Sequence, residues 1–227
     1  MNNNKMAVNR APPHWRNSVR ARMIGRASFQ GKYRMKRQIA AAIALFAMTA
    51  SVSAAADSEV MEETAVYAGG CFWCVESDLE KLDGVGDVVS GYAGGSLPNP
   101  TYRNHEGHRE VVEAPFDPAV ISFRELTDYF LRHIDPLDDG GQFCDRGHAY
   151  TTAIYYQSEQ QKADAEAAVA AAEEELGQDI VTPVLPLDTF WRAEDYHQDY
   201  HEKNPVRYKF YRTGCGRDRR VNAVWKK

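Results

Sequence analysis

The chain has 227 residues, enough for one domain with a sizeable core, and its 44% hydrophobic and 26% charged residues are typical of a soluble globular protein. Residues 1–56 contain ten Lys and Arg and no acidic residue. Residues 57–227 therefore hold 17 basic and 32 acidic residues, a net charge of about −15. A body this acidic repels phosphate, which argues against a nucleic-acid partner.

The first 56 residues divide at Met35. A basic start at residues 35–37, an apolar run over 39–50 and small residues over 51–56 are the three parts of a secretory signal peptide. We therefore expect a signal peptide over 35–56 and export, to the periplasm; the run is short for a membrane span. We interpret residues 1–34 as a non-native extension upstream of the true start, with an Arg-rich mitochondrial transit segment as the alternative.

The first half of the body predicts three strands and a helix. A β-favouring run at 64–68 ends at Gly69-Gly70, and apolar residues then recur at helical spacing over 72–82. Strand character returns at 87–92 and at 109–114. Between these two runs, residues 96–107 are rich in proline and asparagine and predict a loop.

The second half predicts two helices and two further strands. Ser122 is a suitable N-cap for a helix ending near His133, and residues 135–149 predict a second long loop. Residues 153–156 predict a strand. Ser158 is a suitable N-cap for a helix that ends near Leu176. A last strand is expected over 181–187, at an edge because two prolines interrupt it.

This order of elements is β-α-β-β-α-β followed by α-β. It predicts an α+β fold, a ferredoxin-like split βαβ two-layer sandwich with an extra helix and strand and an irregular C-terminal tail. We find no internal repeat or linker in residues 57–227. The interpretation is therefore one domain over 57–227, acting as a monomer.

Cys71 lies where the first strand turns into the first helix, after two glycines. Free N–H groups at a helix N-terminus stabilise a thiolate, and glycines leave the sulfur uncovered. On this spacing alone, a reactive and a structural cysteine are about equally favoured. The four cysteines of the body together would allow two structural disulfides in an oxidising compartment, although a body of this size does not need them to fold.

The neighbouring residues resemble those of the A-type peptide methionine sulfoxide reductases. Six segments match motifs of that family in order along almost the whole body, and together they are far more specific than any one of them. They are Gly70-Cys71-Phe72-Trp73, Gly91-Tyr92-Ala93-Gly94-Gly95, Pro98-Asn99-Pro100-Thr101-Tyr102, Gly107-His108-Arg109-Glu110-Val111, Asp145-Arg146-Gly147-His148-Ala149-Tyr150 and Ala193-Glu194-Asp195-Tyr196-His197-Gln198-Asp199-Tyr200.

The resemblance implies reduction of the S epimer of methionine sulfoxide, free or in proteins. Cys71 is the implied nucleophile, which becomes a sulfenic acid, and Glu110 the implied proton donor, with its pKa raised by an apolar pocket. Tyr102 and Tyr150 are implied to bind the sulfoxide oxygen, and Asp145 to support the site. The implied substrate-binding residues are Phe72 and Trp73, which would hold the methyl group.

Each of these residues also has an ordinary structural interpretation. Without the motif, Glu110 is a surface carboxylate on a strand of mixed polarity, and Asp145 is a turn residue before Gly147. Tyr102 and Tyr150 are two of twelve tyrosines. The histidines of the loops have no convincing zinc spacing, so we predict no metal site.

The sulfenic acid requires a second thiol to resolve it. We predict Cys215 for this role, because it is flanked by glycines and arginines in the tail; Cys74 is the competitor, and Cys144 is interpreted as a buried bystander. The resulting intramolecular disulfide needs an external dithiol reductant such as thioredoxin, and no cofactor.

Two other classes of protein remain as alternatives. Cys71 and Cys74 form a C-x-x-C pair, which is typical of thioredoxin-like disulfide oxidoreductases but leaves the other motifs unexplained. A zinc module built from all four cysteines is the non-enzymatic alternative. It lacks a second closely spaced cysteine pair.

Overall fold

A computed structural model describes residues 62–226 of the chain. The extension predicted at 1–34 and the signal peptide predicted at 35–56 lie outside the described residues. Within the described part, no helix combines the length and the apolar character that crossing a membrane requires.

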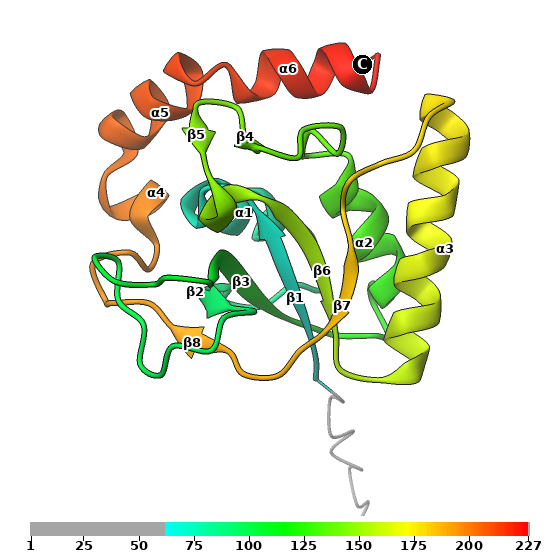
Figure 1. Cartoon of the computed structure of the whole chain (residues 1–227), viewed down its shortest axis with the longest axis horizontal. Helices are drawn as coiled ribbons and strands as arrows, with labels where there is room; N and C mark the ends of the chain where they lie inside the picture. Colours follow the sequence, from blue (N-terminus) through cyan, green and yellow to red (C-terminus); the bar gives the residue numbers. More distant parts are fainter. Residues whose placement is uncertain (1–61, 227) are drawn as a thin grey trace, which may run out of the picture. The chain divides into compact units, whose positions relative to one another are not determined.

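A six-stranded sheet runs through the domain in the order β7-β6-β1-β3-β2-β8 (Figure 1). Neighbouring strands are antiparallel except β6 and β7, which are parallel. The strands are β1 (Glu63–Gly69), β2 (Val89–Ala93), β3 (Arg109–Phe116), β6 (Thr152–Tyr156), β7 (Val184–Pro186) and β8 (Trp191–Arg192). The prediction of a mixed α+β fold is confirmed.

Alternate residues of the central strands face two different layers. On one face, Tyr67 and Val112 pack against α1 (Phe72–Leu79), α2 (Phe123–Leu131) and α3 (Glu159–Leu176). On the other face, Val66 and Val111 pack under the segment that contains Leu185 and Phe190. Because side chains in a strand alternate with period two, the same strands form the floor of both apolar clusters.

The local sequence signals agree well with the observed helices. Ser122 caps α2 in a capping box with Glu125, and Ser158 caps α3, which ends at Gly177 in the left-handed conformation. The loop predicted over 135–149 contains a short hairpin, β4 (Gly141–Gln142) and β5 (Asp145–Arg146), and a 3₁₀ turn, η1 (His148–Tyr150). Both hairpin strands have two residues, too few for a periodic signal.

The prediction of an irregular C-terminal tail is wrong. The segment folds into α4 (Tyr200–Lys203), α5 (Pro205–Gly214) and α6 (Arg217–Val224), drawn orange to red in Figure 1. Pro205 occupies the first turn of α5, where its missing N–H costs nothing. Val221, Val224 and Trp225 recur at helical spacing and are buried in the main core. This spacing was the signal in the sequence for α6.

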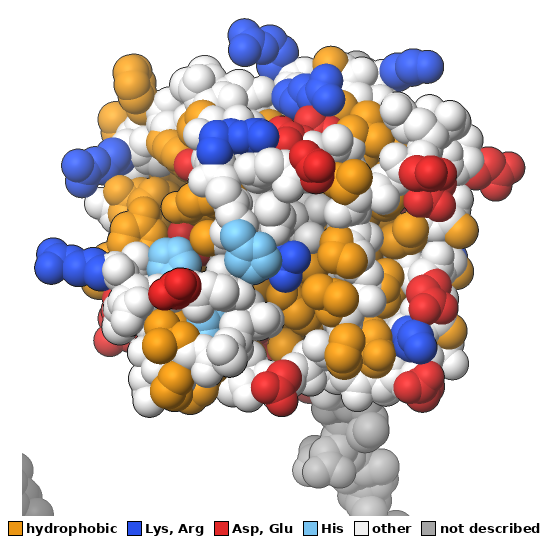
Figure 2. All heavy atoms as spheres, viewed as in Figure 1, with side chains coloured by type: hydrophobic (Ala, Val, Ile, Leu, Met, Phe, Trp, Pro, Cys, Tyr) orange, Lys and Arg blue, Asp and Glu red, His pale blue; other side chains and the backbone are white. Residues whose placement is uncertain are grey.

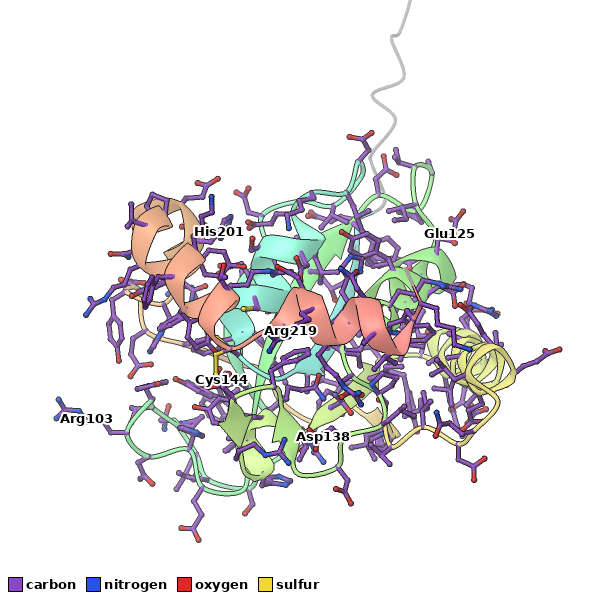
Figure 3. All side chains as sticks on the ribbon, turned by 90° about the horizontal axis from the view of Figure 1, so that it is seen from above. Arg103, Glu125, Asp138, Cys144, His201 and Arg219 are labelled. Atoms are coloured by element: carbon purple, nitrogen blue, oxygen red, sulfur yellow. A yellow bond between two sulfur atoms is a disulfide. The ribbon has the colours of Figure 1, made fainter. Side chains whose placement is uncertain are left out.

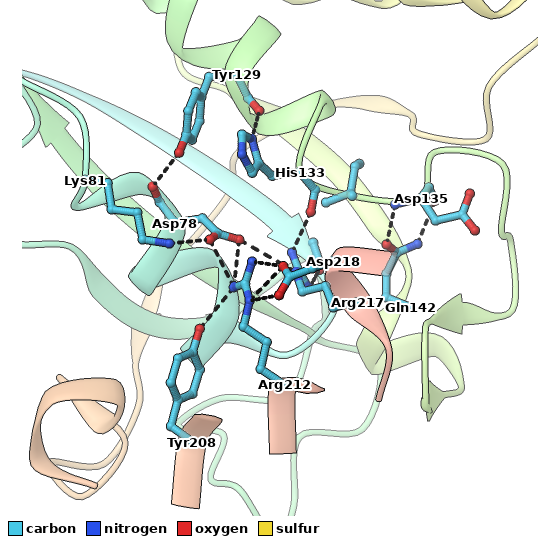
Figure 4. A network of polar contacts seen from close by, with 12 residues as sticks. Asp78, Lys81, Tyr129, His133, Asp135, Gln142, Tyr208, Arg212, Arg217 and Asp218 are labelled. Atoms are coloured by element: carbon cyan, nitrogen blue, oxygen red, sulfur yellow. Dashed lines mark hydrogen bonds and ion pairs between the residues drawn. The ribbon is translucent and has the colours of Figure 1, made fainter. Parts of the chain in front are cut away.

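A buried ionic network fastens these C-terminal helices to α1 (Figure 4). The Asp78 carboxylate of α1 pairs with Arg212 at 3.0 Å, with Arg217 at 3.7 Å and with Lys81 at 2.9 Å. Arg217 is almost completely buried and also donates to the backbone carbonyl groups of Gly69 and His133. The network therefore ties the end of β1, α1 and the C-terminal helices together.

Asp78→Asn is expected to lower the free energy of unfolding by about 3–5 kcal/mol, because it leaves the buried Arg217 guanidinium without its counter-charge. Lys81→Ala removes another partner of the same carboxylate, but the Lys81 side chain is 58% exposed, so we expect a loss below about 1 kcal/mol. Urea unfolding of both variants measures the difference. Equal losses would contradict a structural role for the Asp78–Arg217 pair.

Candidate active site

Cys71 occupies the sharp turn from β1 into α1. It is the N-cap residue of α1 and only 6% exposed. The preceding Gly70 has φ +81°, and a Cβ atom there would lie 2.5 Å from Cβ of Gln142. Only glycine fits this position, since a side chain would meet both backbone strain and a steric clash. The predicted place of Cys71 at a strand-to-helix turn is confirmed.

Burial has the largest effect on the pKa of the Cys71 thiol. It raises the pKa of Cys71, the neighbouring Cys74 and the Glu110 carboxylate raise it further, and the Tyr211 hydroxyl opposes them. This direction is opposite to the stabilisation of a thiolate that a helix N-terminus provides. The adjacent Cys74 has its pKa lowered to about 7 by its hydrogen bond with Cys71 and by the nearby Arg217 and Arg212. Both thiols are free.

Glu110 lies on β3, opposite Tyr92 of β2, with its carboxyl group directed toward the start of α1. Its Oε2 accepts a hydrogen bond at 3.1 Å from the backbone N–H of Phe72, the residue that follows Cys71. The side chain is 2% exposed, and burial raises its pKa to about 8. The alternative of a solvated surface carboxylate is therefore wrong, and at neutral pH most of this group carries a proton.

The two predicted tyrosines meet beside Glu110. The Tyr150 hydroxyl lies within hydrogen-bonding reach of the Glu110 carboxylate and of the Tyr102 hydroxyl. Tyr150 belongs to η1, and Tyr102 to the loop before β3, where its backbone N–H donates to Glu194 at 3.0 Å. Burial raises the pKa of both tyrosines, so their hydroxyl groups remain hydrogen-bond donors.

Asp145 reaches the same site through Tyr211. The Tyr211 hydroxyl donates a short hydrogen bond to Asp145 and lies within hydrogen-bonding reach of the Cys71 sulfur. Burial raises the pKa of Asp145, while Tyr211 and Arg217 lower it. Tyr211 belongs to α5, so the C-terminal helices supply a residue next to the nucleophile. The sequence offered no motif for this residue.

Phe72 and Trp73 have different surroundings. Phe72 is 1% exposed and belongs to the main core, whereas Trp73 is half-buried and stacks on Tyr200, with 3.8 Å between ring centroids. The Trp73 indole N–H donates to Nδ1 of His197 at 3.1 Å. Within the described residues, Nε2 of buried His197 has no hydrogen-bond partner. The motif at 193–200 contains His197 and is the signal in the sequence that could indicate this residue.

The cysteine pairing differs from the expectation. A disulfide joins Cys144 to Cys215, and Cys144 is exposed, so its interpretation as a buried bystander is wrong (Figure 3). The arginines beside Cys215 pair with Asp78 and Asp218 or lie buried, so they are engaged elsewhere. With two of the four cysteines in a disulfide, a zinc site that uses all four does not form in this structure.

Comparisons with known proteins agree with this site. The family "Peptide methionine sulfoxide reductase" matches residues 63–227. A peptide methionine sulfoxide reductase MsrA 2 of Rhizobium meliloti is 55% identical over 163 residues, covering 71% of this chain and 82% of the relative. An MsrA 2 of Caulobacter vibrioides is 45% identical over 190 residues, covering 82% and 95%.

Solved structures of similar proteins share the fold. Methionine sulfoxide reductase A of Corynebacterium diphtheriae has a TM-score of 0.61 at 34% identity, covering 64% of this chain and 76% of that one. The reduced form of Mxr1 from Saccharomyces cerevisiae has a TM-score of 0.60 at 30% identity, covering 64% and 87%.

These matches decide between the predicted activities. The family match spans more than half of the chain and includes the Cys71 motif, so methionine sulfoxide reduction is the activity of this enzyme. A thioredoxin-like C-x-x-C oxidoreductase is not favoured, because it leaves the matched segments outside Cys71–Cys74 unexplained. The chain belongs to the A-type peptide methionine sulfoxide reductase family.

Proposed function

We propose that Cys71 and Glu110 together reduce methionine S-sulfoxide, free or in proteins. One observation carries the proposal. A buried carboxyl group with a pKa of about 8 lies against the backbone N–H that follows a buried free cysteine. A protonated carboxylic acid beside a nucleophile suits a reaction in which an oxygen atom must gain a proton as its bond to sulfur breaks.

The protons and electrons of the proposed step balance within the pair. Glu110 donates its proton to the sulfoxide oxygen while the Cys71 sulfur attacks the sulfoxide sulfur. The S–O bond then breaks, the hydroxyl group passes to Cys71 as a sulfenic acid, and methionine leaves. The proton of the Cys71 thiol returns to Glu110, so methionine sulfoxide is reduced by two electrons and Cys71 is oxidised by two.

The side chains around the pair have supporting roles in this proposal. Tyr102 and Tyr150 donate hydrogen bonds to the sulfoxide oxygen, where negative charge develops. Trp73, held by His197 and Tyr200, forms the wall for the substrate methyl group, and Phe72 packs beneath it from the core. Asp145 acts by orienting Tyr211 toward Cys71.

The oxidised enzyme is regenerated by thiols. In this proposal Cys215 resolves the sulfenic acid, and an external dithiol reductant of the thioredoxin type restores the thiols, with no cofactor.

We further propose that the enzyme is exported to the periplasm and acts as a monomer. The split βαβ, ferredoxin-like description of its centre is supported by the fully antiparallel order β6-β1-β3-β2 with α1 and α2 on one face.

To test this proposal, the full chain is incubated with dithiothreitol and with one epimer of methionine sulfoxide at a time. We expect turnover of the S epimer alone, measured as methionine released. Turnover of the R epimer, or of neither epimer alongside rapid reduction of a disulfide substrate, would contradict the proposal.

A further inference from the structure

Three carboxylate groups meet between α1 and α4, and we refer to them as the acidic cluster. Glu76 lies on α1, Glu80 follows one turn later at its C-cap, and Asp199 immediately precedes α4, which packs beside α1 (Figure 1). One oxygen atom from each of the three lies within 4.8 Å of the other two. Glu76 and Asp199 are 123 residues apart, so no spacing in the sequence could indicate this cluster.

Each carboxylate of the acidic cluster is oriented by a hydrogen bond to one of its two oxygen atoms. The backbone N–H of Asp199 donates to Oε1 of Glu76 at 2.9 Å, and the backbone N–H of Val88 donates to Oε1 of Glu80 at 3.2 Å. Nζ of Lys203 donates to Oδ2 of Asp199 at 2.9 Å. These bonds leave the second oxygen atom of each carboxylate available as a ligand.

Buried polar atoms without a partner lie at the same place. Oε2 of Glu76 and Oγ of Ser90 are buried and make no hydrogen bond within residues 62–226. Burial raises the pKa of Glu76 to about 8, and the nearby Ser90 hydroxyl is among the groups that oppose this effect. Ser90 belongs to β2 and is 0% exposed. Because buried polar atoms are almost always paired, two orphaned oxygen atoms at one acidic cluster point to a bound ligand.

The negative charge of the acidic cluster is only partly balanced. Lys203 pairs with one of the three carboxylates. Nε2 of His201, labelled in Figure 3, lies 3.4 Å from Oε2 of Glu80, but burial lowers the pKa of His201, so the ring is mostly uncharged at neutral pH. Asp87 and Glu202 place further negative charge near Glu80. A proton neutralises one carboxylate, whereas one divalent cation contacts all three.

We propose that Glu76, Glu80 and Asp199 bind one calcium ion, which fastens the segment before α4 to α1. The ligand atoms are carboxylate oxygens, the donors that calcium prefers. Their mutual distances, all within 4.8 Å, suit an ion with bonds of about 2.3–2.6 Å. Zinc is disfavoured, since its protein sites use histidine or cysteine. Glu80 and Asp199 are half-buried, so the ion can enter from solvent and keep water ligands.

The calcium ion has a structural role in this proposal. The segment that it fastens contains His197, which accepts the hydrogen bond of the Trp73 indole, and continues into Tyr200, which stacks on Trp73. Calcium therefore stabilises the fold around this side of the active site and takes no part in proton or electron transfer. Binding does not depend on the proposed reaction of Cys71.

Calorimetric titration of the metal-free full chain with calcium chloride measures the binding directly. We expect one ion per chain, with a Kd of about 10⁻⁴ to 10⁻³ M, as in extracellular calcium modules. Calcium at about 10 mM should raise the melting temperature by about 3–10 °C relative to EDTA, because the ion binds only the folded state. Magnesium at the same concentration should raise it far less, since it requires shorter bonds and stricter geometry.

Glu80→Gln removes one ligand charge while it keeps the shape of the side chain and the hydrogen bond from Val88. We expect at least about tenfold weaker calcium binding and loss of most of the calcium-dependent shift, because ligand charge sets calcium affinity. A melting temperature in EDTA close to that of the wild type shows that the variant is folded. Glu202→Gln is the matched control, because Glu202 is an exposed residue of α4 outside the acidic cluster, and it should keep the full response.

Three results would overturn the proposal. They are a wild type without binding heat or thermal shift, an equal calcium-dependent shift in Glu80→Gln, and an equal shift with magnesium. Methionine release in EDTA with dithiothreitol tests the proposed function separately, because the proposed reaction uses no calcium.

Discussion

Cys71→Ser is expected to abolish methionine sulfoxide reduction, with a fall of at least about 10⁴-fold in kcat/KM under dithiothreitol. A serine hydroxyl is a far weaker nucleophile toward sulfur, and it cannot form the sulfenic acid that the later steps consume. Initial rates of methionine release at saturating reductant measure the effect. The fold should survive, because serine is nearly the size of cysteine and Cys71 makes no side-chain capping bond to α1.

Cys74→Ser is the matched control for this variant. Cys74 lies three residues further along α1, is equally buried and is also a free thiol. We expect it to retain most of the activity with dithiothreitol. Loss of activity in Cys74→Ser comparable with that in Cys71→Ser would show that the pair acts as a dithiol.

Glu110→Gln is expected to reduce kcat/KM by about 10² to 10⁴-fold, the usual contribution of a general acid. Glutamine has the same shape as the protonated acid and can still accept the hydrogen bond from the Phe72 N–H, but it has no acidic proton to donate. Glu113→Gln is the matched control, because Glu113 lies on the same strand three residues away and pairs with Val66 and Val89 outside the site. We expect its activity to stay close to wild type.

The pKa of Glu110 also determines the expected pH dependence. The acid form is required, and burial raises its pKa to about 8, so wild-type kcat/KM should decline as the pH rises above about 8. The folded state binds a proton that the unfolded state has lost between pH 4.5 and about 8. The contribution of Glu110 to the free energy of unfolding therefore falls as the pH rises through this window. Glu110→Gln should lack both trends, and an unchanged alkaline decline in this variant would contradict the assignment.

Charge is distributed unevenly along residues 57–227. Residues 203–227 contain nine Lys and Arg and one Asp, while residues 57–202 contain eight basic and 31 acidic residues. Figure 2 shows Lys and Arg gathered over α5 and α6, and Asp and Glu over α3. Within residues 57–227, the segment that carries Cys215 is therefore the basic part, and its long-range attraction to the acidic remainder adds to the buried ion pairs of Asp78.

Local signals in the sequence determined much of this protein. The strand and helix around Cys71, the capping serines Ser122 and Ser158, and the order β-α-β-β-α-β all follow from period, capping and turn chemistry, which act between near neighbours. The ordered motifs identified Cys71, Glu110, Tyr102, Tyr150 and Asp145 as site residues. The structure brings all five of them to one place around the start of α1.

Only the tertiary structure decided the raised pKa of Glu110, the position of Tyr211, the partner of Cys215 and the C-terminal helices. Each of these features depends on residues that are far apart in the chain. The burial that raises the pKa of Glu110 comes from its position in the folded sheet, and Tyr211 reaches Cys71 only because α5 docks there. The partner of Cys215 is 71 residues away, on a two-residue hairpin too short to leave a pattern. The C-terminal helices were missed because their apolar residues are few and their docking depends on the buried Asp78 network. Sequence period cannot report such a network, since its ion pairs form only when distant segments pack together.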